Sequence, residues 1–485
     1  MTDPIVWSIM LPLLASLLAL AWPNRAAAAA LAGAILGLLA SIALLIEIGQ
    51  HATVTHHLGG WLPGLGIALR ADALSALLLV MAMLVVTATT FYAGSYFSDR
   101  AQAQRFWPLW MMLVAAISAL LLSGDLFNLY VTLELLGLSA VALAALGNSR
   151  ASLEAAIRYL TVGLLGSMAF LAGVALIYGG YGTLDLRQLA QQAEPEILTL
   201  TALGLMTSGL LIKAALFPLH FWLPAAHSSA PAPVSAALSA LVVKVSVYLL
   251  VRLWLDIFEP ALPGSAGLLL GALGSAAVLW GSWQAYRAER LKLLAAYSTV
   301  AQVGYLFLFL AVILGMTDAA LRQQTLAALL VLALTHGFAK SALFLCAGVV
   351  LHRAGHDRIA DLGGTARALP MTTFVIALSC VALIGLPPSG TFLAKWHLIS
   401  DSITTGQWWW IPVIMAGSLL AAAYSFRVLG HAFAPGESSG PMVHWAREEL
   451  PALTLALFAT VVLGLGAAGI WDLVAAGDLY PGAAS

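Results

Sequence analysis

The feature that most constrains this chain is a series of long apolar runs, each close to the roughly 20 residues that a bilayer-spanning helix needs. The 485 residues are 61% hydrophobic and only 9% charged, which excludes a soluble globular protein. We therefore predict an all-α membrane protein, one polytopic domain over residues 1–485, with about fourteen transmembrane helices. The runs lie near residues 4–22, 26–46, 73–95, 107–123, 126–147, 157–179, 198–217, 232–252, 264–284, 294–314, 325–350, 371–399, 410–430 and 452–472.

Basic residues favour every second loop of this arrangement. With the N-terminus outside, thirteen of the 21 basic residues fall in inward loops and four in outward loops. This bias predicts a cell (inner) membrane protein with both termini on the periplasmic side. The inward set is Arg25, Arg100, Arg105, Arg150, Arg158, Arg287, Arg290, Lys292, Arg353, Arg358, Arg367, Arg427 and Arg447, and the outward set is Arg70, Arg187, Arg252 and Arg322.

Composition also limits the ligands and chemistry. The net charge of −1 gives no reason to expect a nucleic-acid partner. Cys346 and Cys380 lie in separate apolar runs and are expected to be small buried side chains rather than metal ligands. No phosphate-binding loop or nucleophile motif stands out, so we expect no cofactor, metal site or catalytic residue. The first basic residue, Arg25, follows the first apolar run, which argues against a cleaved signal peptide.

The remaining four basic residues, all lysines, fall inside predicted spans. A charged side chain at the bilayer centre costs about 2.5–3.5 kcal/mol on insertion scales, and such residues usually mark ion or proton pathways. We therefore interpret the four as parts of an ion path rather than as packing residues. They are Lys213, Lys244, Lys340 and Lys395.

Two of these lysines lie beside predicted helix breaks. Helix seven is interrupted at Pro218 and helix twelve at the sequence GLPPSG, residues 385–390. Helix twelve comes five helices after helix seven, so the two cross the membrane in opposite directions. Inverted repeats with broken helices are typical of transport sites. We predict repeats over 107–252 (helices four to eight) and 264–430 (helices nine to thirteen), although Lys213 precedes its break and Lys395 follows its own.

Glu134 is a carboxylate about eight residues into predicted helix five, roughly 12 Å deep. It is either a proton carrier or a structural partner for a lysine, and a contact with Lys213 would serve both roles. Burial and mutual attraction shift the proton affinities of such a pair in opposite directions, so a pair that opens and closes can act as a proton switch.

Further polar residues extend the predicted path. His336 lies four residues before Lys340, on the same helix face, and can carry a proton near neutral pH. Lys395 would be the terminal site. His220 and His227 would feed protons in from the inner side, or are two interfacial loop histidines. Three further side chains, Ser298, Thr299 and Gln302, would order water or make ordinary interhelical hydrogen bonds.

Other charges are interpreted as structural. Glu154 with Arg158 is expected to be a solvated i,i+4 pair. Two further groups are expected to be loop or interface charges, and two carboxylates are expected to cap helices. The loop groups are Glu289 with Lys292 and both Glu448 and Glu449 with Arg447, and the caps are Asp72 and Asp125.

Five stretches carry a resemblance to a known family, the antiporter-like subunits shared by Mrp-type cation/proton antiporters and respiratory complex I. They are LIKAALFPLHFWLP, AHSSAPAPVSAALSALVVKVSVYLLVR, RLKLLAAYSTVAQVGY, THGFAKSALFL and LIGLPPSGTFLAKW. With Glu134 they cover most of the chain. The resemblance implies a fourteen-helix unit with two inverted five-helix repeats. It also implies proton-path roles for Glu134, Lys213, Lys244, His336, Lys340 and Lys395.

Two details refine the resemblance. A terminal lysine at Lys395 and the VVKVSVYLLVR end of helix eight look like the Mrp D-type subunit, although some complex I members share the lysine. Many relatives carry an acidic residue just before the Ala-His of the loop, and this chain has Ala225 there. Acidic proton uptake at that position is therefore not expected.

The predicted function is proton translocation within an Mrp-type Na⁺ or K⁺/H⁺ antiporter. The resemblance implies partners, namely a large A-type subunit and several small membrane subunits, and a transporter rather than an enzyme. The runner-up is the equivalent pump subunit of complex I or of a membrane-bound hydrogenase, which would make it part of a translocase. A structural membrane scaffold and an energy-coupling subunit for inorganic carbon uptake are further alternatives.

Overall fold

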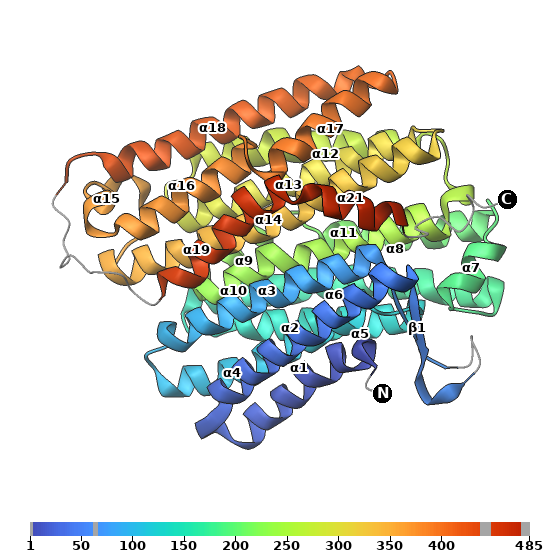
Figure 1. Ribbon diagram of the computed structural model, residues 1–485, viewed down its shortest axis with the longest axis horizontal. Helices are drawn as coiled ribbons and strands as arrows, with labels where there is room; N and C mark the ends of the chain where they lie inside the picture. The colour runs from blue at the N-terminus through green and yellow to red at the C-terminus, as the bar shows by residue number, and fades with distance from the viewer. Residues whose placement is uncertain (1–2, 62–65, 437–447, 477–485) are drawn as a thin grey trace.

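The computed structural model describes residues 3–61, 66–436 and 448–476. In these ranges the chain forms an almost entirely helical bundle whose long helices run side by side along its longest axis (Figure 1). The helices are α1 (Pro4–Ala21), α2 (Ala26–His51), α3 (Ala73–Tyr96), α4 (Arg100–Leu121), α5 (Leu126–Ala145), α6 (Arg150–Tyr181), α7 (Leu186–Gln192), α8 (Ile197–Lys213), α9 (Leu223–Ser229), α10 (Ala232–Ala237), α11 (Val243–Val251), α12 (Ala266–Arg287), α13 (Leu291–Leu314), α14 (Ala319–Ala354), α15 (Thr365–Ala368), α16 (Pro370–Ile384), α17 (Gly390–Thr404), α18 (Ile411–Phe433), α19 (Glu449–Leu457), α20 (Leu463–Leu465) and α21 (Ala467–Ala476). Strands β1 (Val54–His57) and β2 (Ala68–Ala71) form an antiparallel pair with Val54 opposite Ala71 and His57 opposite Ala68.

The helices match the predicted apolar runs. Eleven are long and apolar enough to cross a membrane, and a pair bent by 65°, Glu449–Leu465 with Ala467–Ala475, brings the number to as many as twelve. Two shorter apolar helices, α8 and α16, stand where the sequence predicts broken helices seven and twelve. Counting each broken helix as one crossing would raise the number in the described residues to the fourteen predicted.

The first predicted break is present directly after Lys213. This lysine is the last residue of α8, and no helix resumes until α9 begins at Leu223. Ala215 adopts a left-handed backbone with φ of 53°, which a regular helix cannot continue through. The indole N–H of Trp222 donates to the carbonyl of Ile212 at 2.9 Å, so the end of the break is tied back to α8.

The second predicted break separates α16 from α17. Gly385, with φ of 88°, ends α16 in the left-handed conformation that glycine adopts without strain. The side chain of Ser389 then caps α17 by accepting from the backbone N–H of Phe392. The amide of Gln302 on α13 donates to the carbonyl of Leu383 at 3.0 Å, so α13 satisfies a carbonyl near the break.

Loops that the sequence places on one side of the membrane share one end of the bundle. The β1–β2 hairpin and α7 lie together at one end, where β2 is bridged to Ser123 and Asp125 to Asp185 (Figure 1). At the other end Arg290 is bridged to Arg358. The first group belongs to predicted outward loops and the second to predicted inward loops. Which end of the bundle faces outside the cell stays a prediction. Arg447, one of the basic residues predicted for an inward loop, lies outside the described residues.

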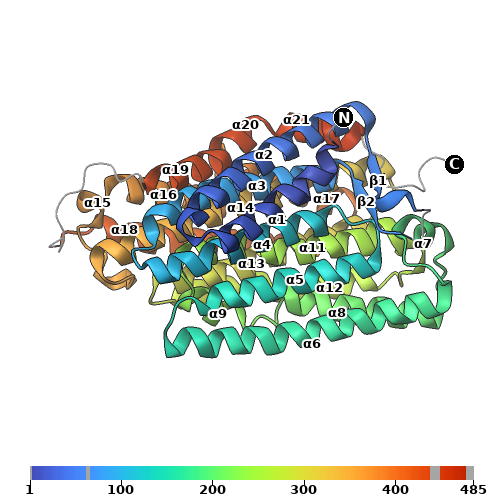
Figure 2. The ribbon, with the colours of Figure 1, turned by 90° about the horizontal axis from the view of Figure 1, so that it is seen from below.

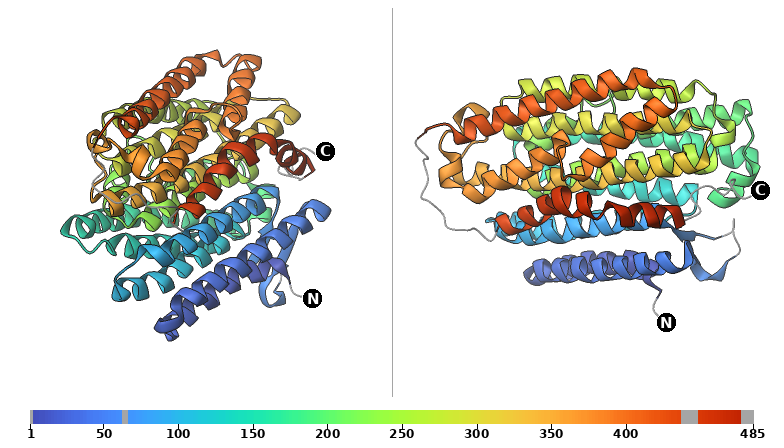
Figure 3. Two further views of the ribbon diagram at one scale, coloured as in Figure 1. Left: turned by 60° about the vertical axis from the view of Figure 1, so that its left-hand side comes forward. Right: turned by 45° about the horizontal axis from the view of Figure 1, so that its top comes forward.

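The buried centre of the bundle consists of α14 and the continuous helix that includes α11. Every residue of α14 from Thr325 to Val350 is buried. The most apolar 18-residue stretch of the span Ala232–Ile257 is also entirely buried. Helices that are apolar all round are buried on all sides. The pair α1 and α2 lies at one edge of the bundle, α17 and α18 lie at the opposite edge (Figure 3), and α6 forms an outer face (Figure 2). Lys244 on α11 and Lys340 on α14 therefore lie deep inside the protein.

Helices α12 and α13 are packed with their backbones in contact. A Cβ added to Gly304 would lie 2.5 Å from the carbonyl oxygen of Gly274, and one added to Gly274 would lie 2.7 Å from that of Gly304. Small residues allow such close approach between membrane helices. Both cysteines are buried and unpaired, as predicted. The predicted limits of the two inverted repeats stay a prediction.

Candidate functional site

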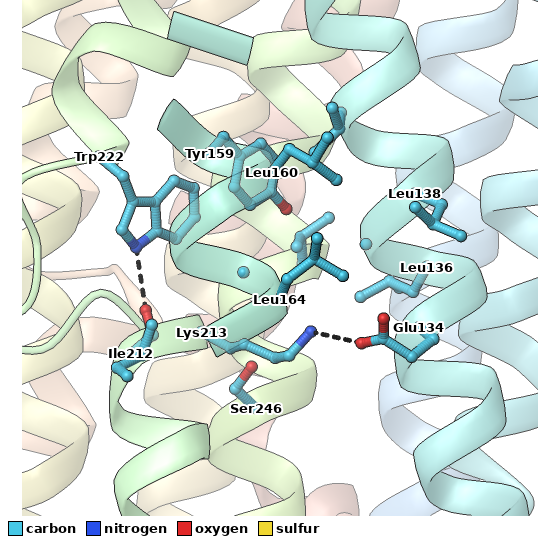
Figure 4. A pocket seen from close by; sticks show the side chains of 14 residues that line it. Glu134, Leu136, Leu138, Tyr159, Leu160, Leu164, Ile212, Lys213, Trp222 and Ser246 are labelled. Carbon is cyan, nitrogen blue, oxygen red and sulfur yellow. Dashed lines mark hydrogen bonds and ion pairs between the residues drawn. The ribbon is translucent and has the colours of Figure 1, made fainter. Parts of the chain in front are cut away.

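Glu134 and Lys213 form an ion pair, the contact that would serve both roles considered for Glu134. The Nζ atom of Lys213 lies 3.2 Å from Oε1 of Glu134 (Figure 4). The hydroxyl of Ser167 on α6 donates to the same carboxylate. Lys213 ends α8, where the negative end of the helix dipole also stabilises a cation. The break of helix seven thus places an ammonium group against the carboxylate on α5.

A small cavity of about 30 Å³ adjoins this pair, and Figure 4 shows its lining. That volume holds a water molecule, which needs about 10–15 Å³ and several polar partners. Tyr159 and Trp222 close one side with parallel rings 4.3 Å apart. Ser246 on α11 also lines the cavity, which therefore reaches from the Glu134–Lys213 pair to the helix that carries Lys244.

Lys244 lies at the centre of the bundle, with only 3% of its surface exposed. It follows a π-helical turn, Leu238–Val242, a feature frequently found at functional sites. Its Nζ donates to the carbonyl of Ser239, inside that turn, at 2.7 Å. Within the described residues no carboxylate is hydrogen-bonded to Lys244, so it differs from Lys213 in lacking a counter-ion.

A line of hydrogen bonds joins the turn below Lys244 to Lys340. The hydroxyls of Ser239 and Thr299 lie 2.8 Å apart, and that of Thr299 donates to the carbonyl of Ala295 at 2.9 Å. Because the proton of Thr299 is used in this way, Ser239 is the donor between the two hydroxyls. Lys340 Nζ donates to the same Ala295 carbonyl at 2.8 Å and to the hydroxyl of Ser298. Helix α13 therefore bridges two lysines that come from α11 and α14.

His336 lies one turn before Lys340 on α14 and is buried. Neither of its ring nitrogens has a hydrogen-bond partner among the described residues. The ring lies within electrostatic range of both Lys244 and Lys340. His336 therefore offers ring nitrogens that are free, among the described residues, to accept a proton, as proton transfer requires.

Lys395 stands at the second break. Its Nζ donates to the carbonyl of Ile384 at 3.0 Å and to the hydroxyl of Ser418 at 2.9 Å, and it lies 4.4 Å from the ring centre of Tyr305. The carbonyl at the end of α16 and the π-face of the ring replace a counter-ion here. Gln302 contacts the neighbouring carbonyl of Leu383 instead of a lysine.

The two candidate uptake histidines differ in surroundings. His220 lies in the first break, its ring 5.5 Å from that of Phe217. His227 lies on α9 and is fully buried, with its ring stacked 4.9 Å from Phe344. The alternative that His227 is an interfacial loop residue is therefore wrong for this chain, because α9 packs into the interior.

The prediction that Lys292 is a loop charge is wrong. Lys292 lies in the first turn of α13, is 2% exposed and donates to the carbonyl of Ala230 directly after α9. Its spacing of three from Ala295 and seven from Thr299 puts it on the helix face that contacts the other lysines. That spacing is the signal in the sequence that could have identified it.

Other structural charges differ in part from expectation. Glu154 pairs with Arg150 at 2.8 Å rather than with Arg158. Glu449 is buried and accepts from the backbone N–H of Thr372 at 3.1 Å, so it is not a loop charge. Asp72 and Asp125 cap α3 and α5 as predicted.

Comparison with known proteins identifies the family. A family model described as NADH:quinone oxidoreductase/Mrp antiporter, TM, matches residues 123–421. The chain is 37% identical over 428 residues to the N-type subunit of NADH-quinone oxidoreductase from Desulforudis audaxviator, covering 85% of this chain and 83% of that protein. It is 28% identical over 400 residues to the D-type subunit of the Na(+)/H(+) antiporter from Alkalihalophilus pseudofirmus, covering 82% and 79%.

Comparison of the fold with solved structures supports the same family. A chain in the structure of the Mrp complex from a Dietzia species superimposes with a TM-score of 0.89 and 26% identity, over 99% of this chain and 98% of that one. The family predicted from the five motif stretches is thereby confirmed. The chain belongs to the transmembrane family shared by NADH:quinone oxidoreductases and Mrp antiporters.

Proposed function

We propose that this chain is the proton-translocating, D-type subunit of a multisubunit Mrp-type Na⁺(K⁺)/H⁺ antiporter in the cell membrane. The observation that carries the proposal is a row of basic groups inside the bundle, in which hydrogen bonds through α13 connect Lys244 to Lys340 and a carboxylate, Glu134, stands at one end. Protons would move between Glu134 and Lys395 by way of three intermediate groups. These are Lys244, His336 and Lys340, with Lys213 controlling the first step.

The Glu134–Lys213 pair would act as the switch. While the pair is closed, the two charges compensate each other. When Lys213 moves away, its positive charge is no longer neutralised, and a second ammonium nearby becomes less favourable by Coulomb repulsion. Lys244 and Lys340 lie within electrostatic range of each other, so protonating one disfavours protonating the other. Such coupling would pass a proton along the row.

Proton access would come from the inner side through His220 and His227, with both termini outside. The excess of basic residues in the predicted inward loops supports this orientation. Ser298 and Thr299 would support the central step through the contacts described, whereas Gln302 would hold the second break in place.

Partners would be the other membrane subunits of the antiporter. The D-type relative and the Mrp complex chain support assembly with a large A-type subunit and several small ones. The chain would be a transporter subunit without catalytic residues of its own, and its substrates would be protons together with Na⁺ or K⁺.

A second candidate is the antiporter-like N-type subunit of complex I, where redox energy would drive the same proton path and make the chain part of a translocase. The specific observation in its favour is the 37% identity to a protein of that name. Neighbouring genes separate the two. Genes for iron–sulfur subunits beside this one would favour complex I, and genes for antiporter A-type and small subunits would favour the antiporter.

The direct test is cation-driven proton flux in vesicles that contain the complete subunit set. Addition of Na⁺ or K⁺ should change the internal pH, as reported by a trapped dye. Absence of this flux from a fully assembled wild-type complex would overturn the antiporter proposal.

A further inference from the structure

A stripe of four polar residues leads away from the central lysine toward one end of the bundle. Lys244, Tyr248, Arg252 and Asp256 recur at every fourth position, along α11 and the π-helical turn Arg252–Ile257 that continues it. Residues four apart lie on one helix face. The stripe therefore runs from mid-membrane to the end that holds the β1–β2 hairpin and α7.

The far end of the stripe opens into a cavity of about 690 Å³. The four arginines that the sequence places in outward loops all line it, together with Asp256 and Glu259. They are Arg70, Arg187, Arg252 and Arg322. A cavity of this size and polarity admits many water molecules. Without a barrier, a proton on Lys244 could exchange with this cavity and bypass the row of lysines.

Tyr248 lines this large cavity and also the small space beside Lys244. That small space is about 10 Å³, and apart from these two residues its lining is aliphatic. It is at the lower limit for one water and lacks the polar partners that a water needs. The ring of Tyr248 is thus the partition between a dry gap and a wet cavity.

The hydroxyl of Tyr248 is fully engaged. It donates to the carbonyl of Leu121 at the end of α4 at 2.8 Å, and it accepts from Nε of Arg252 at 3.1 Å. A hydroxyl relays a proton only if it can accept one while passing on its own. Its proton is held by a backbone carbonyl and one lone pair by a guanidinium that cannot give up its proton, so these contacts hold Tyr248 in a non-relaying arrangement.

Arg252 is locked as well. Its two terminal nitrogens lie 2.5 Å from Asp72 and 2.6 Å from Asp256. Burial alone would raise the pKa of Asp72, but the adjoining Arg252 guanidinium lowers this pKa to about 2, so the carboxylate keeps its charge and its hold on the arginine. A guanidinium has five donors, no acceptor and no accessible neutral form, so it cannot pass a proton on. Arginines in pores are known barriers to protons and cations.

We infer that Tyr248 and Arg252, held by Leu121, Asp72 and Asp256, form a seal that closes Lys244 off from the arginine-lined cavity. This inference rests on the proposed function, because a seal matters only if Lys244 carries protons. Its role would be coupling, because a proton that reaches Lys244 must continue along the lysine row instead of escaping into the arginine-lined cavity.

The test is a leak measurement on the complete complex in vesicles, without transported cation. After a pH jump, Tyr248→Ala should raise the proton leak about tenfold, the change expected when a barrier falls by roughly 1.4 kcal/mol. Tyr248→Phe keeps the ring and adds no relay, so its leak should match wild type. A leak in Tyr248→Phe as large as in Tyr248→Ala would contradict the partition role of the ring.

Two controls make the result specific. Tyr92→Ala removes an equally large buried side chain that borders neither cavity, and it should not leak. Adding Lys244→Ala to Tyr248→Ala should abolish the leak, because the lysine is its source. A leak in Tyr248→Ala no larger than in Tyr92→Ala would overturn the seal while leaving cation-driven flux, the test of the proposed function, unaffected. A leak that persists in the double variant would also overturn it.

Discussion

The two broken helices place their lysines in different surroundings. Lys213 precedes its break and faces the carboxylate of Glu134, whereas Lys395 follows its break and contacts a carbonyl, a hydroxyl and the ring of Tyr305. One end of the row therefore has a counter-ion and the other is held by dipoles alone. We therefore propose that the Glu134–Lys213 end sets the charge state of the row and that the Lys395 end releases the protons that reach it.

The largest effect should come from breaking the end with the counter-ion. Glu134→Gln and Lys213→Ala should each abolish cation-dependent proton flux in vesicles, because either change removes the only ion pair described within the row. Assembly should persist, as checked by co-purification of the partner subunits. Normal flux in both variants would show that the row is not the proton path.

The second prediction is that the complex loses more stability when Lys213 is changed than when Lys395 is changed. Lys213→Met leaves the Glu134 carboxylate with the Ser167 hydroxyl but without its ammonium partner, and should destabilise the complex by about 1–3 kcal/mol, the usual cost of removing one partner from a buried polar group. Lys395→Met leaves behind only neutral groups and should cost less. Thermal unfolding of the purified complexes measures the difference. Equal losses would mean that the counter-ion does not distinguish the ends.

A third prediction asks whether the two ends belong to one path. Thr299→Val removes the hydroxyl between Ser239 and the Ala295 carbonyl and should reduce cation-driven flux about tenfold, equivalent to roughly 1.4 kcal/mol of barrier. Thr201→Val, an exposed position on α8, is the matched control and should have no effect. If Thr299→Val carries wild-type flux, the halves work independently of this link.

The smallest effect is expected at Arg158. This residue directly precedes Tyr159, which lines the cavity at the Glu134–Lys213 pair, but it is exposed on α6 and makes no ion pair with Glu154 in the described structure. Arg158→Ala should leave flux within about twofold of wild type, because surface charges of this kind contribute little. A loss as large as that of Lys213→Ala would show that exposed charges at this end also matter.

The sequence is sufficient for the elements whose signals are local. Apolar runs predict the spans, prolines and glycines predict the two breaks, and an isolated carboxylate among mid-span lysines requires a partner. That argument asks for a lysine partner for Glu134 but does not by itself choose Lys213 among the four lysines. Burial of each lysine also follows from its position within a span.

Contacts between segments that are far apart in the chain cannot be predicted from such local signals. Arg252 and Asp72 are 180 residues apart and each lies at the edge of a predicted span, where an interfacial charge is the ordinary interpretation. The sequence places Lys292 in a loop because α13 begins three residues earlier than predicted. In both cases the missing information is which helices are neighbours, and a single sequence gives only the faces of each helix.

The glycine contact between α12 and α13 has a mechanical consequence. With Gly274 and Gly304 at backbone contact, neither helix can slide along the other by even one residue without steric overlap. The two helices α12 and α13 are thereby expected to move as one unit, and this unit carries Ser298, Thr299 and Gln302. A transport cycle that involves these residues is therefore expected to use rotation of the lysine side chains and movement at the short non-helical breaks, rather than sliding of α12 against α13.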